Sequence, residues 1–580
     1  MTSLIKFPSF INPARVTVQL IRTDEIQFSP VTNIQQVNAR GNPAWRWTYE
    51  FSDLSLNERD VVEAFLMRCK GSVNTFKVTD PADYEMKAGL ADWTDVYSGY
   101  GSFNVSAGSD TNKVNSWFYG GSFVRNHITD ERTLRMEFYR NVSGSAVRWG
   151  GEGAAGRVSS ISAGNAYVQR AKFFQMPERA GGGVALIVGS GSDISIGAGP
   201  VEVRSSDVIT APFVVGAQPS SFYTTAISAR VNTGTTKIGD HFEVADYELK
   251  RCALVVNSEN LLTYSNNFGH ANWSIVNATI SSGWMDADPT GVTSGGWKLF
   301  GDTSVNTRHY IEQTYTKPMT EDLYTVEVYA QADEYAWLYV EMRDNGLPSS
   351  VGAFFNTLSG YLVNSANESG IMRQARKRSY DVGSGTIKCA LSGIVSSLNN
   401  VTVRVYGCSS DGNLEYTNNG SFGLNVFGAN LRKHPLSGPY VPTTDTIVVG
   451  SGWQTGSKIV AAGFDPGDIV KAGQRFEIVN RFNNNSSDLF ERSEFKRVTR
   501  EVIASREGWT NIEFDPPIRN APVTDRSWRT SNHLGETMHN PLIFHKPEMK
   551  ARLLAGTIQY IEKPLQMTDM VFDVIEDMTR

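Results

Sequence analysis

The segment DEYAWLYVEMRDN holds three aromatic residues at alternating positions, followed closely by charged ones. A β-strand would place Tyr335, Trp337 and Tyr339 on one face, because successive side chains point to opposite sides. Flat rings of this kind can stack on the C–H faces of a sugar, while neighbouring polar groups hydrogen-bond its hydroxyls. Arg343 and Asp344 stand close enough to supply such groups. The segment is therefore a candidate carbohydrate-contact site.

The same alternation has a second interpretation. Three aromatics at period two more often fill the interior of a β-sandwich than line a groove, since alternation shows only which residues share a face. Trp273 and Trp297 present the same choice. We expect Trp273 to pack in a core and keep Trp297 as a further contact candidate.

Catalytic motifs are missing from the sequence. None of the eight His residues stands in a metal-binding spacing such as HExxH, and there is no G-x-S-x-G elbow or phosphate-binding loop. Asp333 with Glu334, or Glu312 with Glu321, could hydrolyse a glycoside only if the fold held the two carboxylates opposite each other. Because Asp and Glu are mostly solvated on β domains, we expect no catalytic residues and no enzyme.

Metal and redox chemistry receive little support. The loop SSGWMDADPTG carries Asp286 and Asp288, whose oxygens could hold Ca²⁺, but the spacing matches no EF-hand and a plain turn is favoured. The four cysteines are scattered without CxxC spacing, which argues against a zinc site or a disulfide framework. We expect no cofactor, with Ca²⁺ as the one open possibility.

Composition indicates a multidomain, mainly β protein. A chain of 580 residues exceeds what one hydrophobic core can hold, and its 52 Gly and 11 % aromatic content favour strands joined by many turns. The net charge of −6 and the lack of a Lys/Arg block argue against nucleic acid as a partner. No apolar run long enough to span a bilayer and no signal peptide is present, so we expect no membrane insertion and assembly in the cytoplasm.

The first 81 residues predict a sheet covered by one helix. AWRWTYEF alternates aromatic and polar residues, which is typical of a strand with one buried face. SLNERDVVEAFLMRCKG then changes to helical periodicity, and Ser55 with Glu58 forms a capping box at its start. The expected core of this unit comprises Trp45, Trp47, Tyr49, Phe51, Phe65 and Phe76.

The middle of the chain differs from both ends in its pattern of hydrophobic and turn-forming residues. Short alternating runs between Gly/Ser/Asn turns suggest two tandem β-sandwich domains there, whereas residues 446–580 again read as a compact β unit. We therefore predict a split β-rich assembly domain with one short helix, interrupted by one or two β-sandwich (jelly-roll) domains. The predicted parts are the assembly domain at 1–81 and 446–580, a sandwich-like insert at 82–252, and a jelly roll at 253–445.

The two flanking pieces resemble tail-tip structural proteins of tailed bacteriophages, of the distal-tail or baseplate type. The resemblance rests on QFSPVTNIQQV, GNPAWRWTYEF, VVEAFLMRCKG and NTFKVTDP, followed by GWQTGSKIVAAGFDPGDIVKAGQRFEIVNRF. It extends to Gly473, the PPIR segment ending at Arg519, and a last strand ending in Glu576 or an earlier one at Glu562. The match covers residues 10–81 and 446–576, about a third of the chain. The compact form of such proteins lacks the long middle region present here.

A second resemblance begins at NLLTYSNNFGHANWS. It is similar to the start of carbohydrate-binding-module type jelly rolls that are inserted in phage proteins, and the later Y-x-P-T segment resembles their exit. The matching residues are Asn260, Leu261, Leu262, Ser265, Phe268 and Trp273, then Tyr440, Pro442 and Thr443.

Together the resemblances imply a virion structural protein of a phage tail tip or baseplate that takes part in host adsorption. They imply a homo-oligomeric ring, with a hexamer favoured over a trimer, other phage tail proteins as partners, and host cell-surface polysaccharide as a ligand of the middle domains. A glycan depolymerase is the alternative from another class, and a tail-fibre or receptor-binding adhesin is the third possibility; the missing catalytic motifs disfavour the enzyme. The sequence does not identify the sugar or the host.

Overall fold

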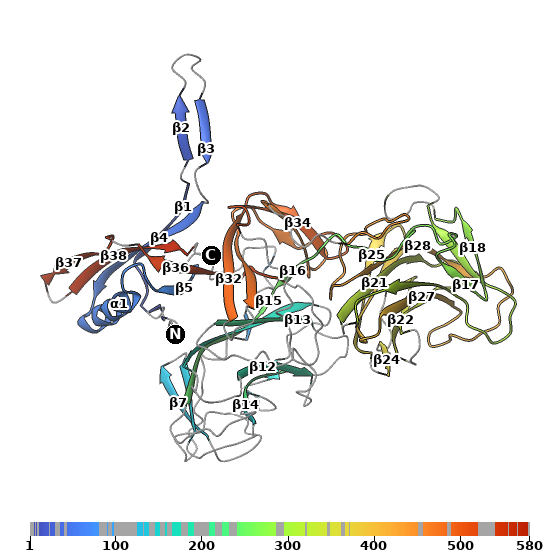
Figure 1. The fold of residues 1–580 in the computed structure, drawn as a ribbon, viewed down its shortest axis with the longest axis horizontal. Helices are drawn as coiled ribbons and strands as arrows, with labels where there is room; N and C mark the ends of the chain where they lie inside the picture. Colours follow the sequence, from blue (N-terminus) through green and yellow to red (C-terminus); the bar gives the residue numbers. More distant parts are fainter. Residues whose placement is uncertain are drawn as a thin grey trace.

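The computed structural model describes most of residues 11–80 and 251–577, and chiefly strand backbones between them. Its larger gaps fall at 29–34, 40–42, 286–289, 291–294, 345–348, 361–365, 450–455, 484–488 and 520–539. The described chain is mainly β, with one α-helix (Figure 1). The predicted fold class is therefore confirmed.

The two ends of the chain share one sheet, which we call the end sheet. Its order is β1-β4-β38-β36-β5, and β37 also pairs with β38. The N-terminal strand β4 and the C-terminal strand β38 are therefore neighbours at its centre. Tyr49 pairs with Phe572 in that central register. The strands are β1 (Arg15–Ile21), β4 (Ala44–Leu54), β5 (Thr75–Thr79), β36 (Glu548–Leu553), β37 (Gln559–Lys563) and β38 (Met567–Glu576).

Helix α1 (Leu56–Cys69) covers the end sheet. The Ser55–Glu58 capping box is present, Lys70 caps the end of the helix in the left-handed conformation, and Gly71 follows it with a positive φ. The Phe65 ring packs edge-on to the Phe76 ring at 4.9 Å. The predicted core residues are all at most 3 % exposed: Trp45, Trp47, Tyr49, Phe51, Phe65 and Phe76.

A closed barrel lies beside the end sheet, in the order β16-β29-β34-β32-β31-β35. Phe495 of β32 receives the rings of Trp45 and Trp47 edge-on, which joins the two bodies. The predicted assembly domain at 1–81 and 446–580 thus consists of two bodies, the end sheet and this barrel. The strands are β16 (Ala253–Val255), β29 (Lys458–Ala462), β31 (Arg475–Asn483), β32 (Leu489–Val498), β34 (Trp509–Asp515) and β35 (Pro541–Ile543), with β30 (Ile469–Val470) pairing β33 (Val502–Ile503) nearby.

Strand β16 corrects one predicted boundary. It was assigned to the start of the jelly roll at residue 253, but it pairs with β29 and β35 of the barrel. The jelly roll begins only where Asn260 pairs with Val448, each amide donating to the other's carbonyl at 2.8 and 2.9 Å. Its first and last residues therefore lie side by side, next to the barrel.

Ten strands between the end sheet and β16 form two further sheets (Figure 1). The four-stranded sheet contains β9 (Ala146–Gly150), β10 (Arg157–Val158), β12 (Val184–Ser190) and β14 (Tyr223–Arg230). The six-stranded sheet contains β6 (Asp95–Tyr97), β7 (Val124–Asp130), β8 (Thr133–Phe138), β11 (Ala166–Gln175), β13 (Val208–Val214) and β15 (His241–Arg251). A separate hairpin, β2 (Asp24–Phe28) with β3 (Gln35–Ala39), projects from the end sheet.

The jelly roll consists of two six-stranded sheets. We call β17-β20-β27-β22-β23-β24 the aromatic sheet and β18-β19-β28-β21-β26-β25 the docking sheet. From β19 to β22, and again from β26 to β28, consecutive strands alternate between the sheets, which is jelly-roll connectivity. The aromatic sheet contains β17 (Ser274–Val276), β20 (Tyr310–Thr316), β22 (Trp337–Arg343), β23 (Ser350–Asn356), β24 (Asn367–Ser369) and β27 (Asn400–Cys408). The docking sheet contains β18 (Ala278–Ser282), β19 (Trp297–Gly301), β21 (Asp322–Gln331), β25 (Arg373–Gly383), β26 (Thr386–Val395) and β28 (Gly423–Arg432).

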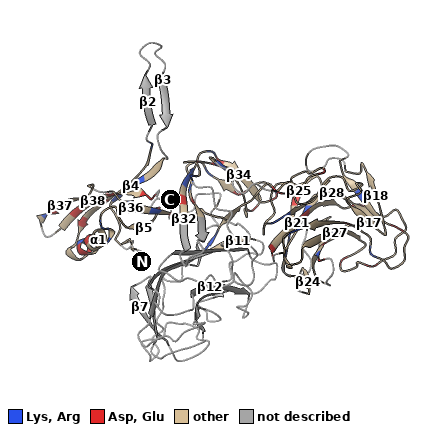
Figure 2. Ribbon diagram, in the orientation of Figure 1, with Lys and Arg blue, Asp and Glu red and all other residues tan. Residues whose placement is uncertain are grey.

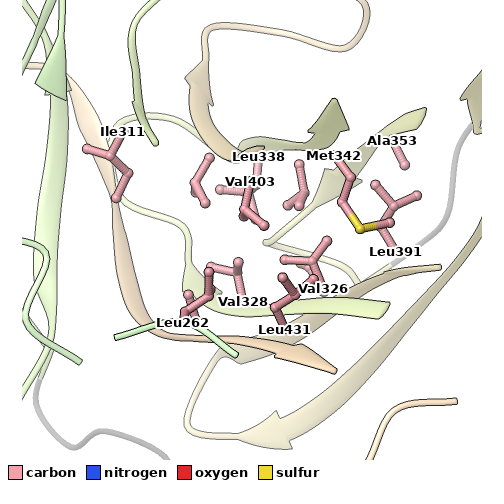
Figure 3. Close-up of a cluster of buried hydrophobic side chains, with 14 of the residues drawn as sticks. Leu262, Ile311, Val326, Val328, Leu338, Met342, Ala353, Leu391, Val403 and Leu431 are labelled. Atoms are coloured by element: carbon pink, nitrogen blue, oxygen red, sulfur yellow. The ribbon is translucent and has the colours of Figure 1, made fainter. Parts of the chain in front are cut away.

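Aliphatic side chains of both sheets meet between them (Figure 3). Leu338 and Val403 of the aromatic sheet face Val328 and Leu431 of the docking sheet, and all four are fully buried. Trp273 lies in the same core, as expected, at 3 % exposure. This core fixes which side chains of each sheet must point outward.

Charged residues of both signs are interspersed along the described strands (Figure 2). The described part of the chain contains no helix with the length and apolar character needed to cross a bilayer. All four cysteines are buried and unpaired.

Candidate ligand-binding face of the jelly roll

Two sets of side chains alternate along β22, and the sandwich core shows which set faces outward. Leu338, Val340 and Met342 enter the core between the sheets. Trp337 and Tyr339, two residues apart, must then lie on the opposite, outer face of the aromatic sheet. The alternation predicted from sequence is therefore real, but these rings do not fill the sandwich core.

A row of rings crosses four strands on this outer face. Tyr310, Tyr406, Tyr339 and Phe354 are cross-strand neighbours, from β20, β27, β22 and β23 respectively. Ring centroids along the row are 4.8, 5.4 and 4.5 Å apart. Tyr406 and Tyr339 are 1 % and 4 % exposed, whereas Tyr310 is half-buried. The row forms an apolar floor with its more open end at β20.

A charged row runs beside the aromatic one. Glu312, Arg404, Glu341 and Gly352 are paired in register across the same four strands. Arg404 donates to Glu312 at 2.6 Å and lies 4.5 Å from the centre of the Tyr310 ring. The charges on this row therefore largely satisfy each other.

Gly352 has a steric reason to be glycine. A Cβ at this position would come within 1.9 Å of the Tyr339 hydroxyl, so the tyrosine side chain lies directly across the glycine. The absence of a side chain lets the aromatic row reach over the charged row. This close approach fixes the Tyr339 ring on the outer face.

Protonation in the two rows follows from burial. Burial and the neighbouring Glu341 raise the pKa of Tyr406, so the Tyr406 hydroxyl keeps its proton and donates to Glu341 at 2.8 Å. Burial also raises the pKa of Tyr339 to about 12. Both hydroxyls therefore keep their protons at neutral pH and do not act as bases.

A third row is built mainly from hydroxyl groups. Thr314, Thr402, Arg343, Ser350 and Ser369 are cross-strand neighbours from β20 to β24. The two threonine hydroxyls lie 2.8 Å apart, and the two serine hydroxyls 3.2 Å apart. Arg343 stands between these pairs and is partly buried. The face thus changes from apolar to polar along the strand direction.

The remaining contact candidates do not join this face. Tyr335 precedes β22 and packs edge-on against Tyr416 and Phe422. Trp297 lies in the docking sheet, where its Nε1 donates to the Asn266 carbonyl at 2.9 Å. It does not share the outer face of the aromatic sheet, and its contact role stays a prediction.

Asp344 is also excluded as a contact residue, because its side chain is completely buried. Burial raises its pKa, an effect that outweighs the opposing influence of Ser396 and Lys317. A carboxyl group with no exposed surface cannot touch a ligand on the outer face. Of the six contact candidates, Trp337, Tyr339 and Arg343 share one face, and Tyr335, Trp297 and Asp344 lie elsewhere.

Sequence reasoning missed most of the outer face. Tyr310, Phe354, Arg404 and Tyr406 come from strands far apart in sequence. The alternation in HYIEQTYT and NVTVRVYGC could have drawn attention to Tyr310, Arg404 and Tyr406, but Phe354 lies in neither segment. Trp284 was also missed. It is 46 % exposed, with the Lys298 ammonium 4.6 Å from its ring centre.

The carboxylate pairs considered for catalysis have structural partners where they are described. Asp333 and Glu334 both contact Lys298, at 2.8 and 2.6 Å. Burial opposes ionisation of Glu334, but hydrogen bonds from Lys298 and a backbone amide outweigh it and lower its pKa. Glu334 therefore stays ionised at neutral pH, unlike a general acid. Glu321 lies outside the described residues.

Asp286 and Asp288, the Ca²⁺ candidates, also lie outside the described residues, so this expectation stays a prediction. Within the described part of the chain, no group of three or more His, Cys, Asp or Glu side chains is placed to hold a metal ion.

The docking sheet turns its outer face to the barrel. Glu507, from the barrel loop before β34, accepts hydrogen bonds from Tyr329 and Lys388, both at 3.0 Å, and from Trp509 at 2.8 Å. Burial alone would raise the pKa of Glu507, but Lys388 and these hydrogen bonds lower it. Lys388 also lies 3.3 Å from Glu327 inside the sheet. The barrel thus covers one outer face of the jelly roll.

Comparison with known proteins gives no family for this chain. No protein-family model matches it, and no curated protein matches its sequence. Among solved structures, it is similar to the N-terminal CBM22-1–CBM22-2 tandem domain of Xyn10C from Paenibacillus barcinonensis, at 10 % identity and a TM-score of 0.20. That match covers 57 % of this chain and 95 % of the other. At this TM-score the match supports no conclusion on fold or function, which must come from the geometry above.

Proposed function

We propose that this chain is a structural protein of a phage tail tip or baseplate that presents a glycan-binding jelly roll. The end sheet and barrel form the anchor in this proposal, and the jelly roll is the part that meets the host surface. Two features support the anchor: the sequence resemblance of the flanking pieces, and the pairing of β4 with β38, which makes one body from both ends. Because the jelly roll is attached at adjacent residues, its insertion adds little loop-closure cost to this body.

One observation carries the glycan-binding part of the proposal. The face of the jelly roll that the barrel leaves uncovered carries the aromatic, charged and hydroxyl rows side by side. Glycan sites combine the same elements, since a sugar has apolar C–H faces and a rim of hydroxyls. Trp337 and Tyr310, both half-buried, are the rings of this face with most surface left for stacking.

The test is binding of the purified full-length protein to capsule and lipopolysaccharide from candidate hosts. Trp337→Ala should weaken binding about tenfold or more, because an aromatic stacking contact is lost in addition to buried area. Trp284→Ala is the matched control, since Trp284 is an exposed tryptophan in the loop after β18 of the docking sheet. Loss of binding with Trp284→Ala alone would move the site to the docking sheet and contradict the proposal.

The anchor part has its own test. Labelling the protein in intact virions should place it at the tail tip, and mass photometry should find rings, with hexamers expected and trimers indicating a fibre. A reducing-sugar assay on the bound polysaccharide should remain flat, because this proposal assigns binding without cleavage. Release of reducing ends would replace the proposal with a depolymerase.

A further inference from the structure

We propose that Arg343 binds the carboxylate of an acidic sugar unit, so that the glycan recognised by the aromatic sheet is a uronic-acid-type polysaccharide. This inference rests on the proposed glycan-binding function and specifies its ligand. It starts from the charge on Arg343, which pairs with no side chain among the residues that the structure describes.

Arg343 differs from the other arginines of the jelly-roll faces. Arg404 is bound by Glu312, and Arg308 by Glu415 at 2.9 Å. On the docking sheet, Arg432 lies 3.0 Å from Glu327. Arg343 makes no ion pair or hydrogen bond through its side chain in the structure as described, although it is partly buried. A partly desolvated guanidinium without a partner is costly, and an anionic ligand would remove that cost.

The neighbours of Arg343 suit a sugar. Ser350, half-buried, and Thr402, buried, flank it in register on either side. Arg343 thus belongs to a stripe of hydroxyl groups whose exposed members are Thr314 and Ser369. Each hydroxyl can both donate and accept, so the hydrogen bonds within the stripe leave capacity for a ligand. A sugar carboxylate at Arg343 would bring its own ring hydroxyls to this stripe.

The surrounding acids favour a single negative charge over a doubly charged phosphate. Glu341 lies two residues before Arg343 on the same face of β22, and Glu312 lies two strands away in the neighbouring row. Repulsion from these carboxylates grows with the charge of the ligand. A planar carboxylate also matches the guanidinium fork in a bidentate arrangement.

The spacing along β22 sets a minimum length for the glycan. Tyr339 and Arg343 are four residues apart on one face, which corresponds to about 13 Å at the usual strand rise. This exceeds the width of one sugar ring. The face would therefore hold an oligosaccharide, with one unit stacked on the half-buried Trp337, beyond Tyr339, and an acidic unit at Arg343.

The test uses the full-length protein and defined carboxylated probes: oligogalacturonate, alginate and hyaluronate oligosaccharides. Calorimetry or glycan-array binding should detect at least one of them, and methyl esterification of its carboxylates should weaken binding. Arg343→Gln should weaken binding about tenfold to a hundredfold, as expected for a charge-assisted hydrogen-bond pair. Arg343→Lys should restore part of it, because a lysine keeps the charge but not the fork.

Arg500→Gln is the matched control, because Arg500 is exposed on the barrel and pairs with no charged side chain among the described residues. It removes the same charge from the whole chain and should leave binding unchanged. Equal losses with Arg343→Gln and Arg500→Gln would indicate only non-specific attraction and overturn the inference.

Failure of this inference is distinguishable from failure of the proposed function. If a neutral glycan binds, if Trp337→Ala abolishes that binding and if Arg343→Gln leaves it intact, the glycan-binding face stands and its acidic ligand is wrong. If none of the carboxylated probes binds, the inference also fails, and the Trp337→Ala test on host polysaccharide still decides the function. Binding of dextran sulfate in preference to every carboxylated probe would likewise overturn the assignment of a carboxylate.

Discussion

The two outer faces of the jelly roll treat charge in opposite ways. On the docking sheet, Lys388, Arg432 and Glu327 are completely buried, and each contacts an opposite charge. On the aromatic sheet, Arg343 is only partly buried and has no such contact in the structure as described. The barrel covers the docking sheet, whose buried charges are paired. The aromatic sheet is left uncovered and presents groups that can still bind a ligand. A β-sandwich inserted into a larger protein can thus use one face for attachment and keep the other for recognition.

The difference between the faces also explains how the recognition face is oriented. Glu507 reaches from the barrel to Tyr329 and Lys388, so several hydrogen bonds converge on one largely buried carboxylate. Buried charges keep a fixed geometry because any shift leaves one of them unpaired. The aromatic sheet is therefore held on the side away from this contact.

The largest effect should come from removing the jelly roll in two different ways. Deleting residues 259–448 cuts at the adjacent pair Asn260 and Val448 and leaves β16 in place, so a short Gly/Ser linker should give a soluble protein with a cooperative thermal transition. Deleting 82–445 also removes β16, which leaves backbone groups of β29 and β35 unpaired. That shorter chain should aggregate. Light scattering and calorimetry of both proteins measure the difference, and equal solubility would contradict the role assigned to β16.

Local sequence signals predicted the end sheet and helix well. The alternation through Trp45 to Phe51 and the Ser55–Glu58 capping box depend on neighbours within a few residues, and the structure shows both as expected. β16 could not be recognised in this way. Its three residues, Ala253–Val255, carry too little pattern to show that they complete a barrel whose other strands lie some two hundred residues further along the chain.

The candidate face was only partly predictable for a related reason. In β22 the residues between the aromatics, Leu338, Val340 and Met342, are themselves apolar, so alternation could not decide which set enters the core. The aromatic row also depends on the register between β20, β27, β22 and β23, which is set by long-range pairing. A single sequence carries no direct signal of that register.

Truncating the central acid of the docking sheet should have the next largest effect. Glu327→Ala leaves Lys388 and Arg432 buried without their shared partner, and the free energy of unfolding of the jelly roll should fall by about 3–5 kcal/mol. Glu415→Ala removes the partner of Arg308 on an exposed pair, so its cost should stay within about 1 kcal/mol. Denaturant titration, following the transition of the jelly roll, compares the two. Similar costs would mean that the docking sheet is no more dependent on charge pairing than the open surface.

Acid should weaken the attachment of the jelly roll through His434. Its Nδ1 accepts from the Leu436 amide at 3.0 Å, so Nε2 carries the proton and donates to the Val255 carbonyl of β16 at 3.1 Å. Burial lowers the pKa of His434 from 6.5 to about 3. The unfolded chain therefore binds the proton first, and stability is lost progressively as the pH falls from 6.5 toward 3.

The expected loss from His434 is about 2 kcal/mol at pH 5 relative to neutral pH. Thermal unfolding from pH 7 to pH 4 measures it. A His434→Gln variant should be less stable at pH 7 but should show a shallower decline with acid, since glutamine does not titrate. Parallel declines in the two proteins would assign the acid sensitivity to carboxylates elsewhere.

The smallest effect on stability is expected for Arg343→Gln, the variant that should weaken glycan binding most. Arg343→Gln breaks no ion pair or hydrogen bond in the structure as described, so the free energy of unfolding should change by less than about 0.5 kcal/mol. Arg404→Gln, on the neighbouring strand, loses the Glu312 contact and the position over the Tyr310 ring, and should cost about 1–2 kcal/mol. Denaturant titration of both variants gives the comparison. If Arg343→Gln proved as destabilising as Arg404→Gln, Arg343 would have a structural partner after all, and the contrast between a completed face and an open one would disappear.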